Sequence, residues 1–392
     1  MGFALTFAKK RLSMQQDTEF ELFRDNYRRF LKEFVAPHYE QWEEDGLIPR
    51  RLWNQLGENG FLCIDVPEEY GGYGAPVHYS LMLVQETAQA GFTSLAVAIG
   101  GQNELVSPYI QNLGSEEQKQ YWLPKMVTGE VVTAIAMTEA NAGSDLQAIR
   151  TQAILNQDHY LVDGSKTFIS NGIHADLIVL VAKTNPEARA KGISLLLVDA
   201  SLNGVEKGRS LKKIGLHAQD TAELFFDQVK VPKNQRLGEE GQGFAYLMQE
   251  LPRERLSISM MALGSILGAI ELTSDYVQQR KAFGQPLSHM QNTRFVLANT
   301  QIKAKAAQAF VDQCAEQYSR DALSVSHVAA LKCFITDTQC DVIDQLLQLF
   351  GGYGYMQEYP ISRFFVDARV QKIYGGTNEI MKEIVARDML GR

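Results

Sequence analysis

The chain changes composition twice along its length, and the order of the three parts constrains the fold more than any single motif does. Residues 1–130 have apolar side chains at helical spacing. Residues 131–235 contain short runs of Ile, Val and Leu separated by Asp, Asn and Gly, as strands between turns do. Residues 236–392 return to long helical patterns, broken at Gly284-Gln285-Pro286 and at Gly351-Gly352. The chain is therefore predicted to form a helical domain, a β domain and a second helical domain.

Two local signals in the first part predict particular helices. Five aromatic residues recur at steps of three and four behind the capping candidate Asp17 and stop before Pro37; they are Phe20, Phe23, Tyr27, Phe30 and Phe34. They are predicted to form one buried helix face. Farther on, Ser115 and Gln118 match a capping box ahead of an amphipathic stretch.

Composition excludes several classes of function. The chain has 38 Lys and Arg against 46 Asp and Glu, a net charge of −8, and no dense basic run, so nucleic acid is not expected as a partner. The four cysteines lie far apart with no C-x-x-C pair, which suits a reducing compartment. The seven histidines offer no H-E-x-x-H pair, and no metal site is predicted.

The sequence contains no clear membrane or export signal. No uninterrupted apolar run reaches the roughly 18 residues needed to cross a bilayer. Lys9, Lys10 and Arg11 are soon followed by Asp17 and Glu19, unlike a long Arg-rich transit peptide. The expected location is the cytoplasm.

Most of the Gly-rich segments do not fit a phosphate-binding loop. Residues 351–354 lack the trailing G-K-[ST], and residues 241–243 lack the third glycine of G-x-G-x-x-G. A nicotinamide site of the Rossmann type is therefore unsupported. Residues 136–145, AMTEANAGSD, differ because they follow a predicted strand and offer the Thr138 hydroxyl and free backbone N–H groups, which suit a flavin edge or a pyrophosphate. A polar hairpin turn is the structural alternative.

Other segments carry aromatic, hydroxyl and cationic groups at informative positions. KTFISNG at 166–172 has an aromatic residue two positions before a hydroxyl; RKAFGQP at 280–286 and MQN at 290–292 combine a cation with amides; QLFGG at 348–352 permits close backbone approach. For Phe168 and Ser170 the alternative is an apolar strand residue followed by a turn, and for Arg280 it is a solvated side chain at a helix end.

Taken together and in this order, the segments resemble those of flavin-dependent acyl-CoA dehydrogenases over most of the chain, from about Glu19 to Arg387. The closest likeness is to the long-chain type, through GLHAQDTAELFF at 215–226, MQELP at 248–252 and VDARV at 366–370. The resemblance implies an N-terminal helical domain, a middle β-barrel and a C-terminal four-helix bundle. It also implies a homo-oligomer, commonly a dimer of dimers, which binds FAD and an acyl-CoA and passes electrons to an electron-transfer flavoprotein.

The resemblance also implies a set of cofactor contacts. Phe168 would cover the flavin ring, and Ser170 would reach its redox end. Arg280 and Gln291 would meet the adenosine and pyrophosphate of a neighbouring subunit's cofactor, and other residues would complete the two surfaces; these are Ile135, Met137, Thr138, Gly143, Ser144, Gln348, Gly351, Gly352, Thr377 and Glu379. Ala140 and Phe168 replace the Pro and Trp that are more usual in the family.

The catalytic base is the main departure from the commonest family pattern. Many members carry a glutamate at the position of Gly375 in IYGGTNE, whereas the long-chain and isovaleryl types carry it at the position of Glu254 in LPRERL. Glycine has no proton-transfer group, so Glu254 is predicted to remove the α-proton of the thioester. Ser144, Arg255, Gly375 and Gly376 are expected to contact the substrate, the glycine turn through a backbone N–H that stabilises the developing negative charge.

Three functions from different classes follow from these residues. The first is an acyl-CoA dehydrogenase, and the second is an oxygen-using relative such as an acyl-CoA oxidase. The third is a catalytically silent flavin and CoA binder, suggested by Gly375.

Against the catalytic role of Glu254 stands the alternative that Arg253, Glu254 and Arg255 form a charged surface face of a helix. The small residues of 95–101 predict an acyl pocket that admits extended chains, with tight helix packing as the alternative.

Overall fold

The computed structural model describes residues 18–391, so Asp17 and the basic residues near the N-terminus lie outside the described part of the chain. Helices come first, then a sheet, then helices again, which confirms the predicted order. The first helical region contains α1 (Thr18–Phe30), α2 (Tyr39–Asp45), α3 (Arg50–Glu58), α4 (Val77–Gln89), α5 (Thr93–Gly100), α6 (Ser107–Leu113) and α7 (Glu116–Val127). Two π-helical segments, η1 (Leu31–Val35) and η3 (Gly101–Val106), continue α1 and α5.

Two of these helices confirm most of the local predictions from the sequence. Phe20, Tyr27 and Phe30 are buried, as the aromatic stripe predicts, but Phe34 is 39% exposed because the π-helical turn after α1 shifts it off the buried face. At the start of α7, the Ser115 side chain accepts from the Gln118 N–H and the Gln118 side chain accepts from the Ser115 N–H. The predicted capping box is therefore present.

The middle region is one eight-stranded sheet whose hydrogen-bonded order is β6, β7, β3, β2, β4, β5, β8, with β1 added in parallel to β4. Its strands are β1 (Thr133–Ala136), β2 (Gln152–Asn156), β3 (His159–Ser170), β4 (Leu177–Lys183), β5 (Ile193–Asp199), β6 (Val205–Ser210), β7 (Thr221–Pro232) and β8 (Arg236–Leu237). The predicted β domain is confirmed. Among the described residues, β6 and β8 stand at the two ends of the hydrogen-bonded strand order.

The sheet is buried on both faces near its centre. Alternate residues of β4 enter two different cores: Leu177, Val179 and Val181 pack with helices α6 and α7, and Ile178 and Leu180 pack inside the β region. A strand covered on both sides needs a continuous apolar run, because successive side chains point to opposite faces. This explains the LIVLVAK sequence of β4.

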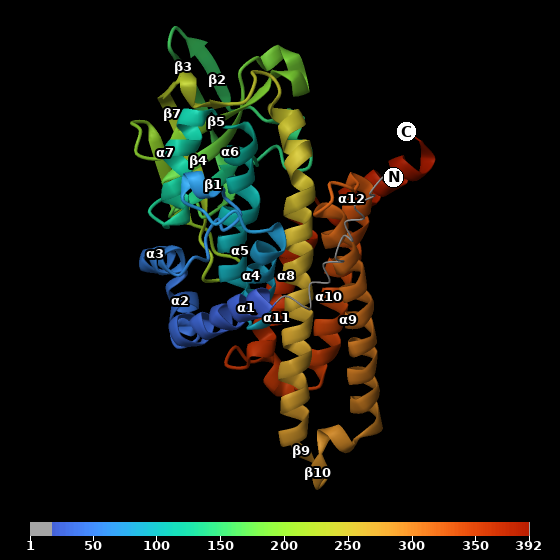
Figure 1. Ribbon diagram of the computed structural model, residues 1–392. Coiled ribbons are helices and arrows are strands. Elements are labelled where there is room, and N and C mark those ends of the chain that lie inside the picture. Colours follow the sequence, from blue (N-terminus) through green and yellow to red (C-terminus); the bar gives the residue numbers. More distant parts are fainter. Residues whose placement is uncertain (1–17, 392) are drawn as a thin grey trace, which may run out of the picture.

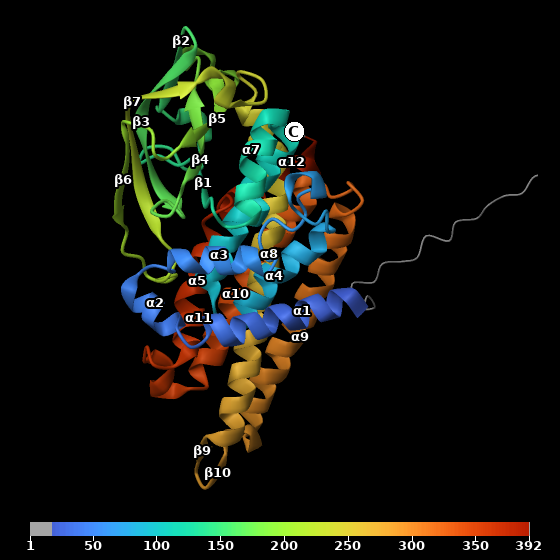
Figure 2. The ribbon, with the colours of Figure 1, turned by 60° about the vertical axis from the view of Figure 1, so that its left-hand side comes forward.

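The C-terminal region is built around α8 (Gly243–Gln279), a helix of 37 residues. The other elements are β9 (Lys281–Ala282), β10 (Gln285–Pro286), η7 (Leu287–His289), α9 (Gln291–Tyr318), α10 (Val325–Gln348), η8 (Gly351–Tyr355), α11 (Pro360–Ala368), η9 (Arg369–Lys372) and α12 (Asn378–Leu390). In Figure 1, α8 runs from the sheet at one end of the molecule to the β9–β10 hairpin at the other, with α9 and α10 beside it. After a turn of the view, α1 crosses this long bundle (Figure 2).

Close packing of α8 against α4 depends on two glycines. A Cβ at Gly264 would overlap the carbonyl of Gln85, and a Cβ at Gly268 would overlap that of Gln89. Only glycine permits this approach of the two helices. Within residues 18–391, α8 is the one helix long and apolar enough to cross a membrane by length and composition, yet 83% of its most apolar stretch is buried inside the protein.

Candidate active site

Glu254 lies on a segment of α8 that is anchored by the preceding residue. The buried Arg253 guanidinium pairs with Asp65 at 2.7 Å and with Glu104 at 2.8 Å. Because neighbouring side chains on a helix point about 100° apart, fixing Arg253 also fixes the direction of Glu254. Arg253 and Arg255 are both buried and Glu254 is half-buried, so these residues do not form a solvated helix face.

The Glu254 carboxyl is held in a desolvated position. Its Oε2 is buried and has no hydrogen-bond partner in the described part of the chain. Burial raises the pKa of Glu254 to about 7, and the nearby cations Arg255 and Lys332 oppose the shift. A carboxyl that titrates near neutral pH is suited to accept a proton there. Burial also raises the pKa of the neighbouring Tyr109, and the negative charge of Glu254 raises it further.

The two alternative base positions converge in space. A Cβ built at Gly375 would lie 3.5 Å from Glu254 Oε1, although the two residues come from α8 and from the turn before α12. The same Cβ would overlap Ile258 Cδ1, and the backbone at Gly375 has φ of 64°. A side chain at Gly375 would therefore reach the place that Glu254 already fills.

The turn at Gly375 and Gly376 is held from α8 and α10. Arg255 Nε donates to the Gly375 carbonyl at 3.3 Å, and Lys332 Nζ donates to the Gly376 carbonyl at 2.8 Å. Burial lowers the pKa of Arg255, with Glu254 opposing the shift. Arg255 thus contacts the turn that is expected to supply a backbone N–H.

A second set of predicted residues gathers on the sheet, where the ends of β1 and β3 meet. Lys166 Nζ lies 2.9 Å from both the Glu139 carboxylate and the Met137 carbonyl, and the Thr167 N–H donates to the Thr138 carbonyl at 2.9 Å. The Glu139 carboxylate also accepts from two backbone N–H groups, those of residues 150 and 151. This buried ion pair ties the two predicted flavin motifs together, a role that the sequence did not assign.

The surface presented by these two motifs fits a flavin. Phe168 is 67% exposed and has φ of 60°, in the left-handed region that bulky residues avoid. Strained and exposed residues of this kind are often found at ligand sites, which agrees with the role predicted for Phe168. Ser170, two residues on, is also exposed. The structure therefore presents an exposed aromatic ring and, two residues along the chain, an exposed hydroxyl.

The remaining residues assigned to this surface lie on β1 and the loop after it. Ile135, Met137 and Thr138 are half-buried, whereas Gly143 and Ser144 are exposed. A Cβ at Gly143 would meet nothing within 4 Å, so the loop leaves room for a ligand next to its backbone N–H groups. These hydroxyl and amide donors suit the polar edge of a flavin and a pyrophosphate.

A third set lies at the far end of α8. Arg280, Gln348, Gly351 and Gly352 line one pocket of about 530 Å³, and the Arg280 guanidinium lies 5.1 Å from the ring centre of Tyr353. About 26 residues of nearly continuous helix separate Arg280 from Glu254, which is roughly 39 Å along the axis. The structure thus does not bring Arg280 and its neighbours to the Glu254 site of the same chain.

Three predicted contacts have other positions. Gln291 is exposed at the first turn of α9, close in sequence to the β9–β10 hairpin. Thr377 is the N-cap of α12, where its hydroxyl accepts from the Ile380 N–H. Glu379 is exposed in the first turn of that helix. Thr377 and Glu379 are near the glycine turn, whereas Gln291 belongs to the Arg280 end of the molecule.

Sequence reasoning missed Lys332, which is fully buried on α10 and contacts the glycine turn. The one available signal was a lysine between apolar residues in a helical pattern.

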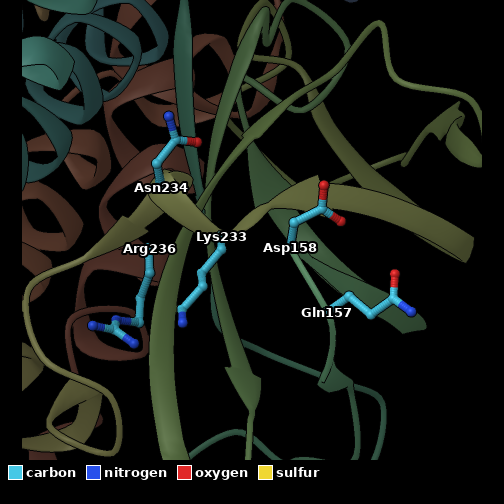
Figure 3. Close-up of a pocket in the computed structure, with 5 residues that line it drawn as sticks. All are labelled: Gln157, Asp158, Lys233, Asn234 and Arg236. Carbon is cyan, nitrogen blue, oxygen red and sulfur yellow. The ribbon is translucent and has the colours of Figure 1, made fainter.

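Another pocket, of about 590 Å³, contains no predicted site residue. Figure 3 shows it at the tip of the β2–β3 hairpin, lined by Gln157, Asp158, Lys233, Asn234 and Arg236. Among the described residues, no three His, Cys, Asp or Glu side chains gather in a way that could hold a metal ion.

Comparison with known proteins matches most of the chain to the three domains of one family. Residues 17–130 match the acyl-CoA dehydrogenase N-terminal domain, residues 134–229 the middle domain and residues 241–390 the C-terminal domain. The mitochondrial long-chain specific acyl-CoA dehydrogenase of Sus scrofa is 45% identical over 95% of this chain and 87% of its own length.

Solved structures agree with this match. An acyl-CoA dehydrogenase from Geobacillus kaustophilus is 48% identical, with a TM-score of 0.93 over 96% of this chain and 99% of that one. A structure described as the electron transferring flavoprotein of Acidaminococcus fermentans is 33% identical, with a TM-score of 0.92 over 100% of both chains. A glutaryl-CoA dehydrogenase from Mycobacterium smegmatis in complex with FADH2 is 25% identical, with a TM-score of 0.90 over 96% of this chain and 95% of that one. From the three domain matches and these likenesses we conclude that the chain belongs to the acyl-CoA dehydrogenase family of oxidoreductases.

Proposed function

We propose that this acyl-CoA dehydrogenase oxidises a fatty acyl-CoA to the trans-2-enoyl-CoA, with Glu254 as the base that removes the α-proton. The observation that carries the proposal is the convergence of Glu254 Oε1 with the side-chain position at Gly375, 3.5 Å from a Cβ built there. A carboxylate at either position reaches the same reacting atom, so the loss of one is compensated by the other. The raised pKa of Glu254 supports proton transfer near neutral pH.

Other residues of the site act on the thioester carbonyl. As the α-proton leaves, negative charge grows on the carbonyl oxygen, and a backbone N–H of the glycine turn would stabilise it. Arg255 holds that turn through the Gly375 carbonyl. Because a backbone donor does not depend on a side chain, Gly375 keeps this role although it has no carboxylate.

We also propose FAD as the cofactor. When bound, FAD supplies the acceptor for the β-hydride. Phe168, Ser170, Thr138 and Ser144 would hold it on the sheet side. The exposed, strained Phe168 and the open loop at Gly143 support this assignment, and a relative of the same fold has been described in complex with FADH2. The buried Lys166–Glu139 pair would keep the two binding motifs in register.

The distance between the two ends of α8 supports an oligomer. Arg280 and the pocket at Gly351 are too far from Glu254 to bind the same flavin ring, and they would instead receive the diphosphate of a neighbouring copy's cofactor. A dimer is the smallest assembly that allows this, and a dimer of dimers is our proposal. Light scattering of the FAD-loaded protein tests it, and a monomer that retains FAD would contradict it.

The electron acceptor is proposed to be an electron-transfer flavoprotein. A structural neighbour over the full length of the chain is described under that protein's name, which supports the proposal. The competing function is an oxygen-using oxidase. Prompt peroxide formation in air with acyl-CoA alone would favour the oxidase, whereas turnover that requires added electron-transfer flavoprotein favours the dehydrogenase.

Anaerobic mixing with acyl-CoA substrates is the direct test of the reaction. The purified protein is expected to be yellow, to release FAD on denaturation, and to lose its flavin absorbance when a substrate is added. FMN, or no flavin even after reconstitution, would refute the cofactor. A flavin that stays oxidised with every acyl-CoA would favour the catalytically silent binder instead.

Chain length is to be settled by a panel from butyryl-CoA to palmitoyl-CoA. A preference for extended chains is proposed, as in the relatives described as long-chain specific. Part of the small-residue segment is explained by packing alone, because a Cβ at Gly100 would lie 3.2 Å from Val84 Cγ1. A clear preference for four-carbon acyl chains in this panel would reject the extended pocket.

A further inference from the structure

Lys332 is a fully buried lysine whose hydrogen-bond partners carry no charge. Its Nζ donates to the Gly376 carbonyl at 2.8 Å and to Asn378 Oδ1 at 3.1 Å. Burying a cation costs stability unless it is well compensated, and replacement by an apolar side chain is often tolerated. A lysine kept in such a place, beside the expected active site, therefore needs a functional explanation.

The segment that Lys332 contacts is intrinsically flexible. Gly375 and Gly376 both have positive φ, 64° and 89°, and glycine loses more conformational freedom than other residues when it is fixed. Two cations hold successive carbonyls of this turn: Arg255 holds that of Gly375 and Lys332 holds that of Gly376. In a trans peptide the C=O of one residue and the N–H of the next point in opposite directions, so holding these two carbonyls fixes the N–H groups of Gly376 and Thr377 and restricts the Gly375 N–H next to them.

Lys332 also acts on the base through its charge. Its ammonium group opposes the rise in the pKa of Glu254 that burial causes. Burial in turn lowers the pKa of Lys332 to about 8, so the ammonium form predominates at neutral pH. A Cβ built at Gly375, in the turn that Lys332 holds, would lie 3.5 Å from Glu254 Oε1. One buried cation is thus coupled to both parts of the proposed machinery.

We propose that Lys332 is a positioning residue of the dehydrogenation: together with Arg255 it holds the Gly375–Gly376 turn so that its N–H groups face the thioester carbonyl, and it favours the carboxylate form of Glu254. This inference rests on the proposed function of Glu254. The competing role is purely structural, since Asn378 also accepts from Thr336 and connects α12 to α10. The two roles differ in their effect on the pH profile.

The experiment compares Lys332→Met with Lys230→Met in the FAD-loaded enzyme. Methionine has a stem of similar length without charge or donor, and Lys230 is an exposed lysine on β7. With saturating palmitoyl-CoA under anaerobic conditions, Lys332→Met is expected to slow flavin reduction by roughly 10- to 100-fold, since a misplaced donor costs about that much. The apparent affinity for palmitoyl-CoA should change little, because the turn acts mainly in the transition state.

A purely structural role of Lys332 would leave the pH dependence of flavin reduction unchanged. Loss of the ammonium raises the pKa of Glu254, so the acid limb of flavin reduction should move to higher pH in Lys332→Met. Several other groups face this region and stay in place in both variants: Tyr109 on α6, Arg255 on α8, Cys333 and Asp337 on α10, Lys372 on η9, Tyr374 after it, and Glu379 and Lys382 on α12. A slower enzyme with an unmoved acid limb would overturn the proposal.

Hydrogen exchange gives a reading that needs no turnover. Peptides covering residues 370–378 should exchange faster in Lys332→Met than in Lys230→Met, with and without FAD, because the carbonyl of Gly376 has lost its donor. Unchanged exchange there would remove the positioning role. This measurement also separates two failures: if Glu254→Gln leaves flavin reduction intact, the proposed base is wrong, whereas the exchange result still reports on Lys332.

A second variant covers the case in which Lys332→Met does not fold. Lys332→Arg keeps the charge and displaces the donor, so it should slow flavin reduction without moving the acid limb. An unchanged rate, or a limb that moves although the charge is retained, would each contradict the proposal. Asn378→Ala serves as the structural comparison, because it leaves both the charge and the Gly376 contact in place and should not move the limb.

Discussion

Two positions about 39 Å apart along α8 carry two different kinds of site. In the N-terminal half of α8, Arg253 is buried and paired with two carboxylates of the first helical region, and the half-buried Glu254 has an Oε2 without a hydrogen-bond partner in the described part of the chain. At the other end, Arg280 is exposed beside an open pocket of about 530 Å³ that contains backbone glycines. The same helix therefore supports one desolvated site and one accessible site.

The difference shows how burial assigns a role to a charged residue. A base that works near neutral pH needs its carboxyl taken out of water, which raises the pKa of Glu254 to about 7. A cation that receives a diphosphate, the role proposed for Arg280, must be accessible before the ligand arrives, and Arg280 is exposed. The desolvated end suits proton transfer, and the accessible end suits binding between copies of the chain.

The largest expected effect is at the buried end. Glu254→Gln should slow anaerobic flavin reduction by ~10²- to ~10⁴-fold, the usual contribution of a positioned general base, while FAD and acyl-CoA binding remain near normal. The amide keeps the size of the side chain and removes its basicity. The matched control is Glu250→Gln, one turn earlier on α8, where the carboxylate accepts from Asn112. Near-normal reduction by Glu254→Gln would remove this residue from the mechanism.

At the accessible end, Arg280→Gln should weaken FAD binding without altering the chemistry. A charge-assisted contact is worth about 1.5–3 kcal/mol, so the dissociation constant for FAD should rise by roughly 10- to 100-fold. Flavin reduction with excess FAD should stay close to that of the unmodified enzyme. Lys281→Gln, at the exposed neighbouring position, provides the control. Equal FAD affinity of the two variants would show that Arg280 contributes nothing beyond general charge.

Rescue at Gly375 sharpens the description of the buried end. Gly375→Glu in the Glu254→Gln background places a carboxylate where the two base positions converge, but the new Cβ overlaps Ile258 Cδ1. We therefore expect recovery of about tenfold only when Ile258→Ala is added, limited by the ~1–3 kcal/mol cost of a side chain at positive φ. Recovery is measured as anaerobic flavin reduction. A triple variant that folds, binds FAD and remains as slow as Glu254→Gln would contradict the convergence.

The smallest expected effect is on stability. Glu254 has a pKa raised to about 7 in the folded protein, so the folded state binds more protons than the unfolded state between the two pKa values. Its contribution is present at low pH and is lost as pH rises through 7. Glu254→Gln should therefore stabilise the protein at pH 8 by about 1–3 kcal/mol and have little effect at pH 5. Urea unfolding at both pH values, with Glu250→Gln alongside, measures it; equal gains at both pH values would argue against desolvation.

Much of the fold was predictable because its signals are local. The capping box at Ser115 and Gln118 needs only neighbouring residues, and it is present. The apolar runs that became β4, β5 and β7 were visible as runs of branched residues. Phe34 was placed wrongly on the buried face because the π-helical turn after α1 gives no periodic signal.

The candidate site was only partly predictable. Glu254 and Gly375 were found through their motifs, but the alternative that Arg253, Glu254 and Arg255 form a surface face could not be dismissed from spacing alone. Pairing of Arg253 with Asp65 and Glu104 dismisses it, and these partners lie more than 100 positions away in the chain. The role of Lys332 was invisible for the same reason, since its contacts are with the turn before α12.

By itself the sequence determined the order of helical and β regions, the residues able to carry a proton or a charge, and the absence of a carboxylate at 375. These properties depend on residue type and on periodicity, both of which are local. Tertiary packing places Glu254 Oε1 3.5 Å from a Cβ built at Gly375, buries Glu254 Oε2, and separates Glu254 from Arg280 by about 39 Å along α8. Distance and burial arise from long-range packing, and therefore no single segment of the chain contains them.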